Sequence, residues 1–258
     1  GILTLITRQK HTASDTPEIR IKHYNHMLKK MSTYLQHSLP KKTKKKLTRK
    51  QKNQHKSQPS IFILTFKGDL KASQTKSLAE EISVLLTIAN PKKDIILLKL
   101  ESPGGTVPGY GLAAAQLARI KSAGIKLVVS IDQVAASGGY MMAAVADKII
   151  AAPFAIIGSI GVVAGIPNFH RVLQKNEVDY HLFTAGKYKR TVTPFSKVTK
   201  EGKQKVQDDI SAIHDAFKKV IKEGRPDVDI EEIATGEYWL ASQAKAVSYT
   251  HLTLPTKA

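Results

Sequence analysis

The chain of 258 residues contains no cysteine, a single tryptophan and few other aromatic residues. The absence of cysteine excludes structural disulfides, thiolate metal sites and a cysteine nucleophile. Acidic residues are also scarce, because 21 Asp and Glu stand against 40 Lys and Arg, and the net charge is +19. The length allows one large domain or two small ones, and hydrophobic residues, which make up 42% of the chain, are enough to build a substantial core.

Long hydrophobic runs are nearly absent as well. The first seven residues, GILTLIT (1–7), are too few to span a bilayer, which takes about 20 residues. They are followed at once by Arg8 and Lys10, so we interpret 1–7 as the remnant of an N-terminal membrane anchor; a frayed apolar terminus is the alternative. The apolar run 149–167 contains two prolines and three glycines, which favours consecutive buried strands and turns over a membrane span.

The positive charge is concentrated near the N-terminus. Residues 1–58 hold 15 Lys and Arg but only two acidic residues. The stretch KKTKKKLTRKQKNQHK (41–56) has almost no apolar side chains, so 8–58 is predicted to be a basic, partly disordered linker. This stretch lacks the aromatic residues on which bases stack. Because the apolar segment 1–7 precedes it, we expect an anionic lipid surface, rather than nucleic acid, to be its partner.

From residue 60 onward, strand and helix patterns alternate. Near-continuous apolar strands separated by amphipathic helices indicate an α/β fold with a parallel sheet covered by helices on both faces. The predicted strands are 61–66, 94–100, 126–131, 148–152 and 180–186, and the predicted helices are 73–90, 109–124 and 200–224, with a short helix after Ser137.

A serine in the stretch VAASGG (134–139) follows the third predicted strand, and a second glycine-containing loop, ESPGGTV (101–107), follows the strand before it. The carboxyl ends of parallel strands meet at one edge of the sheet, where sites form. Acyl transfer requires a nucleophile and two backbone N–H groups aimed at the developing oxyanion. The N–H of Gly138 and that of a glycine in the other loop are candidates for these donors.

The residue that would take the proton of Ser137 is less evident. His170, His181 and His214 lie inside the folded region, but no acidic partner is implied for any of them. The segment TAGKYKRTVTPF (184–195) offers Lys187 and Lys189. A lysine becomes a usable general base when an apolar pocket lowers its pKa. The residues alone leave both the histidines and the lysines open, and an ordinary solvated surface is the alternative for the lysines.

Three stretches together resemble the signal peptide peptidase family: ESPGGTVPGYGLAAAQL, VAASGGYMMAAVADKIIAAPFAIIGSIGVVA and TAGKYKRT. The resemblance covers about residues 60–246 and implies a serine peptidase with a ClpP/crotonase-like core. It places the nucleophile at Ser137, the general base at Lys189 and the oxyanion donors at Gly105 and Gly138. Ser159 matches a serine that orients the lysine, and Lys187 is only a neighbour. The implied chemistry needs no metal or other cofactor.

The resemblance also implies membrane association, peptide substrates and a homo-oligomer. It places the protein at the bacterial inner membrane with a periplasmic catalytic domain, whereas the lysines next to the anchor favour a cytoplasmic flank. The peptidase domain is predicted to occupy 59–247. The last residues, SYTHLTLPTKA (248–258), do not resemble the family, so we expect a non-native tail there.

Two other functions compete with a membrane-associated serine endopeptidase that cleaves signal-peptide remnants or other hydrophobic peptides. A crotonase-type enzyme acting on acyl-CoA would share the fold and the glycine-containing loops. A catalytically inactive scaffold for membrane quality control would share everything except turnover. The combination of Ser137 with Lys189 favours the peptidase, since thioester chemistry does not require such a dyad.

Overall fold

The computed structural model describes residues 59–244 and 252–253, together with Lys22, Tyr24, His26, Met27, Lys30 and Met31. The chain divides into two units, residues 1–58 and 59–258, and the sheet belongs to the second. The predicted anchor (1–7) lies outside the described residues, as do most of the predicted linker (8–58) and tail (248–258). Within the described part of the chain, no helix is both long and apolar enough to cross a membrane.

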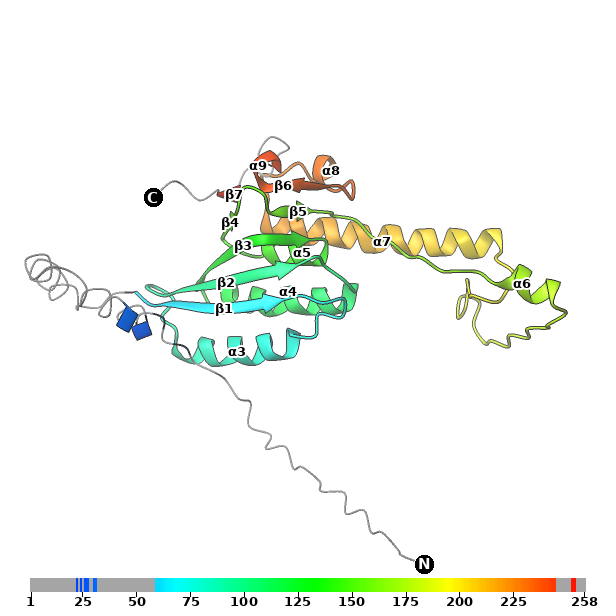
Figure 1. The fold of residues 1–258 in the computed structure, drawn as a ribbon, viewed down its shortest axis with the longest axis horizontal. Coiled ribbons are helices and arrows are strands. Elements are labelled where there is room, and N and C mark those ends of the chain that lie inside the picture. The colour runs from blue at the N-terminus through cyan, green and yellow to red at the C-terminus, as the bar shows by residue number, and fades with distance from the viewer. Residues whose placement is uncertain are drawn as a thin grey trace, which may run out of the picture. The chain divides into compact units, whose positions relative to one another are not determined.

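A predominantly parallel sheet forms the centre of the second unit (Figure 1). Five strands follow one another in the order β1-β2-β3-β4-β7, and all pairs along this path are parallel. β5 pairs with β3 in parallel, and β6 pairs with β5 in antiparallel fashion. The strands are β1 (Ile61–Lys67), β2 (Ile95–Ser102), β3 (Lys126–Ala136), β4 (Lys148–Ala151), β5 (Ile156–Gly158), β6 (Tyr238–Leu240) and β7 (Leu252–Thr253).

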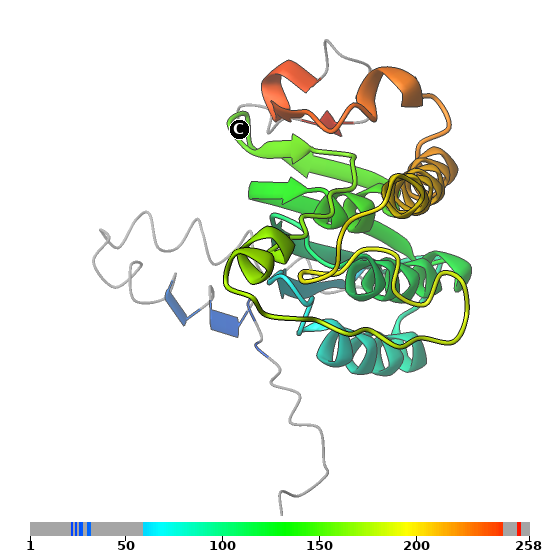
Figure 2. The same ribbon diagram turned by 90° about the vertical axis from the view of Figure 1, so that its right-hand side faces the viewer.

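One face of the sheet carries the principal helices (Figure 2). Four helices contact one another in the order α3, α4, α5, α7, so they form one layer. The prediction that helices cover both faces is therefore wrong for the described residues. On β1, Leu64 and Phe66 are buried, whereas Ile61 and Ile63 are 60% and 39% exposed. The sequence of β1 has apolar residues on both of its faces, so the pattern did not indicate that one face lacks a covering helix. The helices are α3 (Thr75–Ile88), α4 (Val107–Ser122), α5 (Gly138–Ala144), α6 (His170–Lys175), α7 (Lys200–Gly224), α8 (Ile230–Ile233) and α9 (Ala241–Ala244).

The central strand β3 has two neighbours on one side. Its first half, Val128–Ile131, pairs with β4, and its last three residues, Val134–Ala136, pair with β5. On the other side, the register with β2 shifts between Leu100 and Ser102. β3 therefore runs to Ala136, five residues beyond the predicted end, and delivers residue 137 to the edge where β2 and β5 also end.

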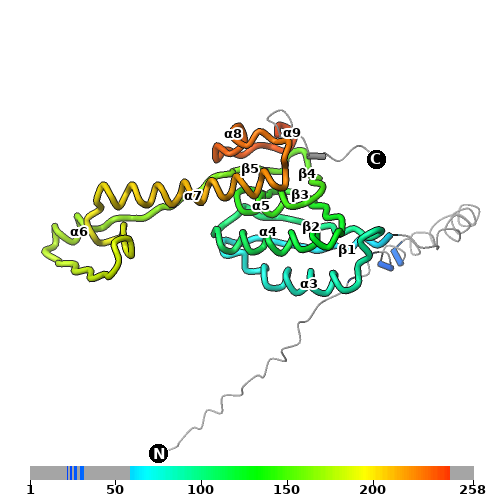
Figure 3. Tube along the Cα trace, turned by 180° about the vertical axis from the view of Figure 1, so that it is seen from behind, coloured from blue at the N-terminus to red at the C-terminus, as the bar shows by residue number. Residues whose placement is uncertain are grey.

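The segment 162–199 between β5 and α7, here called the arm, contains only the short helix α6 and irregular structure. Its first part runs from β5 along α7, and the remainder, with α6, lies at the N-terminal end of α7, away from the sheet (Figures 1 and 3). The other end of α7 is anchored at the sheet: Phe217 and Ile221 are buried there, and Gly224 lies against the carbonyl of Ala144. The strand predicted for 180–186 is absent, because these residues are exposed and have no strand partner.

Candidate active site

Ser137 occupies a strained turn between strand and helix. It directly follows β3 and is the N-cap of α5, with φ 52° and ψ −123°. A positive φ is uncommon for a residue with a Cβ and persists only where the surroundings enforce it. Here the N–H of Ser137 donates to the Gly158 carbonyl oxygen at 2.8 Å, and its own carbonyl accepts from Met141. The turn thus presents a half-buried hydroxyl at the end of the sheet, as nucleophile elbows do.

Ser159 lies beside Ser137 on the adjacent strand end. β3 and β5 are in register at Ala136 and Gly158, so each serine is the first residue after the same paired position. Ser159 also has a positive φ, 52°, and is half-buried. The structure therefore places at adjacent strand ends the two serines that the family resemblance singled out, Ser137 as nucleophile and Ser159 as the residue that orients the lysine.

The glycine loop after β2 meets this turn. A Cβ built on Gly104 would lie 2.7 Å from the Ser137 Cβ and 2.8 Å from the Gly138 nitrogen. Gly104 also has φ +92°. The lack of room for a Cβ and the positive φ therefore both require glycine at this position. Gly105, the predicted oxyanion donor, backs onto Leu70, whose carbonyl oxygen would be 2.2 Å from an added Cβ.

Some backbone N–H groups around this loop donate hydrogen bonds within the protein and others do not. The Gly104 N–H donates to Ser102 Oγ, and the Thr106 N–H donates to the Leu70 carbonyl. Within residues 59–244, the N–H groups of Gly105 and Gly138 have no hydrogen-bond acceptor. Unpaired donors of this kind are available to a developing oxyanion.

The two candidate lysines are not next to Ser137. Both lie in the arm, where residues 187–190 form a turn rather than the extended segment that would alternate their side chains. Lys187 Nζ lies 2.8 Å from Glu201 Oε1 and 4.9 Å from the ring centroid of Tyr188. The hydrogen bond to Glu201 raises the pKa of Lys187, so its proton is held more tightly. Lys189 is exposed, and its N–H donates to the Gly186 carbonyl.

Within the described residues, none of the three histidines is hydrogen-bonded to Ser137. His181 is exposed and His170 begins α6 in the arm. His214 is half-buried on α7 and its Nε2 lies 3.2 Å from the Ile160 carbonyl oxygen. That contact ties α7 to the chain just beyond Ser159. In the described part of the chain no three His, Asp or Glu side chains are grouped as metal ligands would be.

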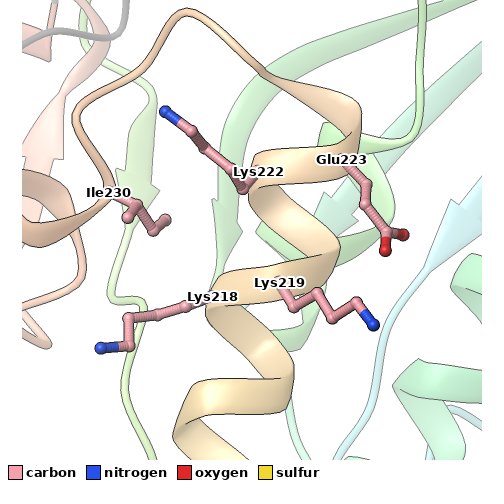
Figure 4. A pocket seen from close by; sticks show the side chains of 5 residues that line it. All are labelled: Lys218, Lys219, Lys222, Glu223 and Ile230. Carbon is pink, nitrogen blue, oxygen red and sulfur yellow. The ribbon is translucent and has the colours of Figure 1, made fainter.

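A hollow along the C-terminal half of α7 is unrelated to this site (Figure 4). Lys218 pairs there with Asp215 and Glu231, and Lys222 donates to the Val228 carbonyl. These lysines fasten α7 to its neighbours, and no lining residue belongs to the β3–α5 turn or to the glycine loop. Its lining residues are Lys218, Lys219, Lys222, Glu223 and Ile230.

The architecture and the serine turn together define an α/β protein with a ClpP/crotonase-like fold. A solved structure with this fold is the 1510-N membrane-bound stomatin-specific protease, a mutant of which is in complex with a substrate peptide. It matches with a TM-score of 0.50 over 78% of each chain, at 16% sequence identity.

The sequence identifies the family within that class. Residues 1–117 match the N-terminal region of peptidase family S49, and residues 119–252 match peptidase family S49 itself. The chain therefore belongs to peptidase family S49. This membership favours the peptidase hypothesis over the acyl-CoA hypothesis.

The similar proteins include proteases named SohB and a signal peptide peptidase. A probable protease SohB of Haemophilus influenzae is 56% identical over 187 residues, which are 72% of this chain and 53% of that protein. A probable protease SohB of Buchnera aphidicola subsp. Schlechtendalia chinensis is 44% identical over 262 residues, covering 94% of this chain and 86% of that protein. A putative signal peptide peptidase SppA of Enterococcus faecium is 32% identical over 152 residues, 58% of this chain and 44% of that protein. The chain spans about half the length of the Haemophilus relative.

Proposed function

We propose that the chain is the catalytic part of a membrane-associated serine endopeptidase that uses a Ser137–Lys189 dyad. The observation that carries this proposal is the strained half-buried Ser137, flanked by two backbone N–H groups without acceptors in residues 59–244. Substrates are remnants of signal peptides or other hydrophobic peptides. The relatives named protease SohB and signal peptide peptidase SppA support this substrate class.

The reaction proceeds by acyl transfer. Ser137 Oγ attacks the scissile carbonyl carbon, and Lys189 Nζ takes the hydroxyl proton. The carbonyl oxygen becomes an oxyanion that accepts hydrogen bonds from the N–H groups of Gly105 and Gly138. The lysine ammonium then gives its proton to the leaving amine as the peptide C–N bond breaks. A water molecule, deprotonated by the same lysine, then attacks the acyl carbon. As the ester C–O bond breaks, the lysine ammonium returns its proton to Ser137 Oγ and the acid product is released.

Lys189 is preferred to Lys187 as the base for an electrostatic reason. A lysine accepts a proton only in its neutral form. The Glu201 carboxylate and the Tyr188 ring both favour the ammonium of Lys187. Lys189 has no ion pair within the described residues. Ser159, beside Ser137, is suited to receive a hydrogen bond from the ammonium of Lys189 during turnover.

Lys189 reaches Ser137 from a second copy of the chain. The arm that carries it lies beyond the sheet at the outer end of α7 (Figures 1 and 3), and it exposes many large apolar side chains. Phe183 and Val163 are 91% and 93% exposed. Exposed apolar surface of this kind marks an interaction site. A neighbouring copy would cover the arm and bring its lysine to a serine, in keeping with the homo-oligomer predicted from the sequence.

A mixing experiment tests both the dyad and the assembly. Ser137→Ala and Lys189→Ala should each be inactive alone. After unfolding and refolding of an equal mixture, roughly one quarter of the sites would pair an intact serine with an intact lysine, if copies assemble at random. Lys187→Ala, refolded in the same way with Ser137→Ala, is the control for the neighbouring lysine. A mixture that stays inactive while wild-type protein refolds to full activity would rule out a dyad shared between copies.

A further inference from the structure

A buried chain of hydrogen bonds runs behind the glycine loop. The Gly104 N–H donates to Ser102 Oγ at 3.1 Å. Ser102 Oγ lies 2.7 Å from the Tyr110 hydroxyl, which donates to the Asp69 carbonyl oxygen at 2.8 Å. Ser102 and Tyr110 are both fully buried.

The direction of every hydrogen bond in this chain is fixed. The Asp69 carbonyl only accepts, so the single phenolic proton of Tyr110 is committed to it. The hydroxyl of Ser102 must then donate to Tyr110, which leaves Ser102 Oγ free to accept from the Gly104 N–H. Burial raises the pKa of Tyr110, so the proton stays in place. Consecutive hydrogen bonds of this kind strengthen one another.

The same two side chains pack against the turn that bears Ser137. A Cβ on Gly138 would lie 2.4 Å from Cγ of the Tyr110 ring, so that ring lies directly against the Gly138 backbone. A Cβ on Gly139 would lie 2.5 Å from the Ser102 carbonyl oxygen. Gly68, which follows β1, also contacts Ser102, because a Cβ on Gly68 would lie 2.1 Å from Ser102 Oγ. The side chains of this hydrogen-bond chain are therefore closely packed between the end of β1, the glycine loop and the start of α5.

We propose that Ser102 and Tyr110 are positioning residues that fix the Pro103–Gly104 peptide through the Gly104 N–H, and thereby hold the following Gly105 N–H where it meets the oxyanion. This inference rests on the proposed function and extends it to residues that contact no substrate. The Gly104 N–H is directed inward to Ser102, so the neighbouring Gly105 N–H is left for the substrate. The Tyr110 ring holds the second donor, Gly138, in place from behind.

The test uses variants that keep the volume of the site. Tyr110→Phe and Ser102→Ala should each lower kcat by about 10-fold to 100-fold, less than the loss of a whole oxyanion donor. KM should change by less than about two-fold, because the oxyanion forms only in the transition state. The double variant should lose little more than either single variant, because both changes interrupt one chain.

A matched control separates positioning from stability. Ile120→Val removes one methylene from the buried face of α4, the helix that carries Tyr110. It should lower the melting temperature comparably but leave kcat unchanged. A peptide aldehyde, which forms an oxyanion with the nucleophile, should bind the Tyr110→Phe variant more weakly by the same factor as kcat falls. The corresponding peptide alcohol should bind both proteins equally.

Two results would overturn the inference. One is an unchanged kcat in Tyr110→Phe and Ser102→Ala. The other is a loss of kcat in Ile120→Val equal to theirs. Failure of the proposed function looks different, since Ser137→Ala would then retain turnover and the wild-type protein would form no aldehyde adduct at Ser137. That result would remove the positioning role together with the site.

Discussion

Replacing Gly104 by alanine should disable the site while leaving the protein folded. The added Cβ would lie 2.7 Å from the Ser137 Cβ, and 2.8 Å from both the Ala136 carbonyl oxygen and the Gly138 nitrogen. All three atoms belong to the rigid β3–α5 turn, so the loop that carries Gly104 must move instead. The residue also has φ +92°, which alanine adopts only with strain.

The magnitude follows from two contributions. A positive φ costs a residue with a Cβ about 1–2 kcal/mol. Overpacking a filled site costs typically about 1–3 kcal/mol. The free energy of unfolding should therefore fall by about 2–5 kcal/mol, against about 5–15 kcal/mol available to a typical domain. Movement of the loop displaces the Gly105 N–H, and loss of one such donor lowers kcat by about 10²–10³-fold.

The assay combines peptide turnover with thermal unfolding followed by circular dichroism. Gly111→Ala on α4 is the matched control, because no atom other than those of its chain neighbours and its own helix backbone lies within 4 Å of the added Cβ. That variant should be more stable by about 0.5–1 kcal/mol, as alanine is in a helix, with kcat unchanged. A Gly104→Ala variant with wild-type kcat would refute the argument that Gly104 fixes the oxyanion loop against Ser137.

Three further predictions concern the arm and its anchor. Lys189→Ala and Lys189→Arg should both abolish peptide turnover, since arginine remains protonated and cannot act as a base. Lys187→Ala should retain most of the turnover, and the reverse pattern would assign the base to Lys187. Glu201 has its pKa lowered by the hydrogen bond from Lys187, so Lys187→Ala should raise the pKa of Glu201 in a carboxylate titration followed by NMR. This exposed pair contributes to stability at pH values above the pKa that Glu201 has in the unfolded chain, and the contribution is lost as the pH falls through the lower pKa of Glu201 in the folded protein. A Glu201 titration that is unchanged in Lys187→Ala would show that the pair does not form. Arg225, buried at the end of α7, donates to the Ala146 carbonyl, and Arg225→Ala should lower the free energy of unfolding by about 2–4 kcal/mol in urea denaturation; an unchanged midpoint would mean that α7 is anchored without it.

The sequence predicted the sheet and the serine turn well, for a local reason. Short apolar strands and the helices between them are encoded in short-range patterns, and β1 to β4 each begin within one residue of the predicted start. The meeting of two loops at the ends of adjacent strands follows from parallel topology alone. That is why the sequence pattern was enough to place Ser137 and the loop containing Gly105 at one edge of the sheet.

The parts that could not be predicted depend on tertiary contacts. Gly104, rather than Gly105, is the glycine that fits against Ser137, and only the three-dimensional approach of the two loops distinguishes them. Ser102 and Tyr110 resembled an ordinary strand end and a core aromatic residue, with no sequence signal for a shared hydrogen-bond chain. The apolar alternation at 180–186 resembled a strand, but no neighbouring strand is available to pair with it in the arm.

The most direct test of the account is covalent labelling by a fluorophosphonate probe, with the modified residue identified by mass spectrometry. We expect one equivalent of probe on Ser137 in the wild-type protein, and neither labelling nor peptide turnover in Ser137→Ala. Removing a nucleophile of this kind typically lowers the rate on the order of 10⁶-fold. Labelling at a different serine, or turnover that survives in Ser137→Ala, would contradict the assignment of Ser137 as the nucleophile.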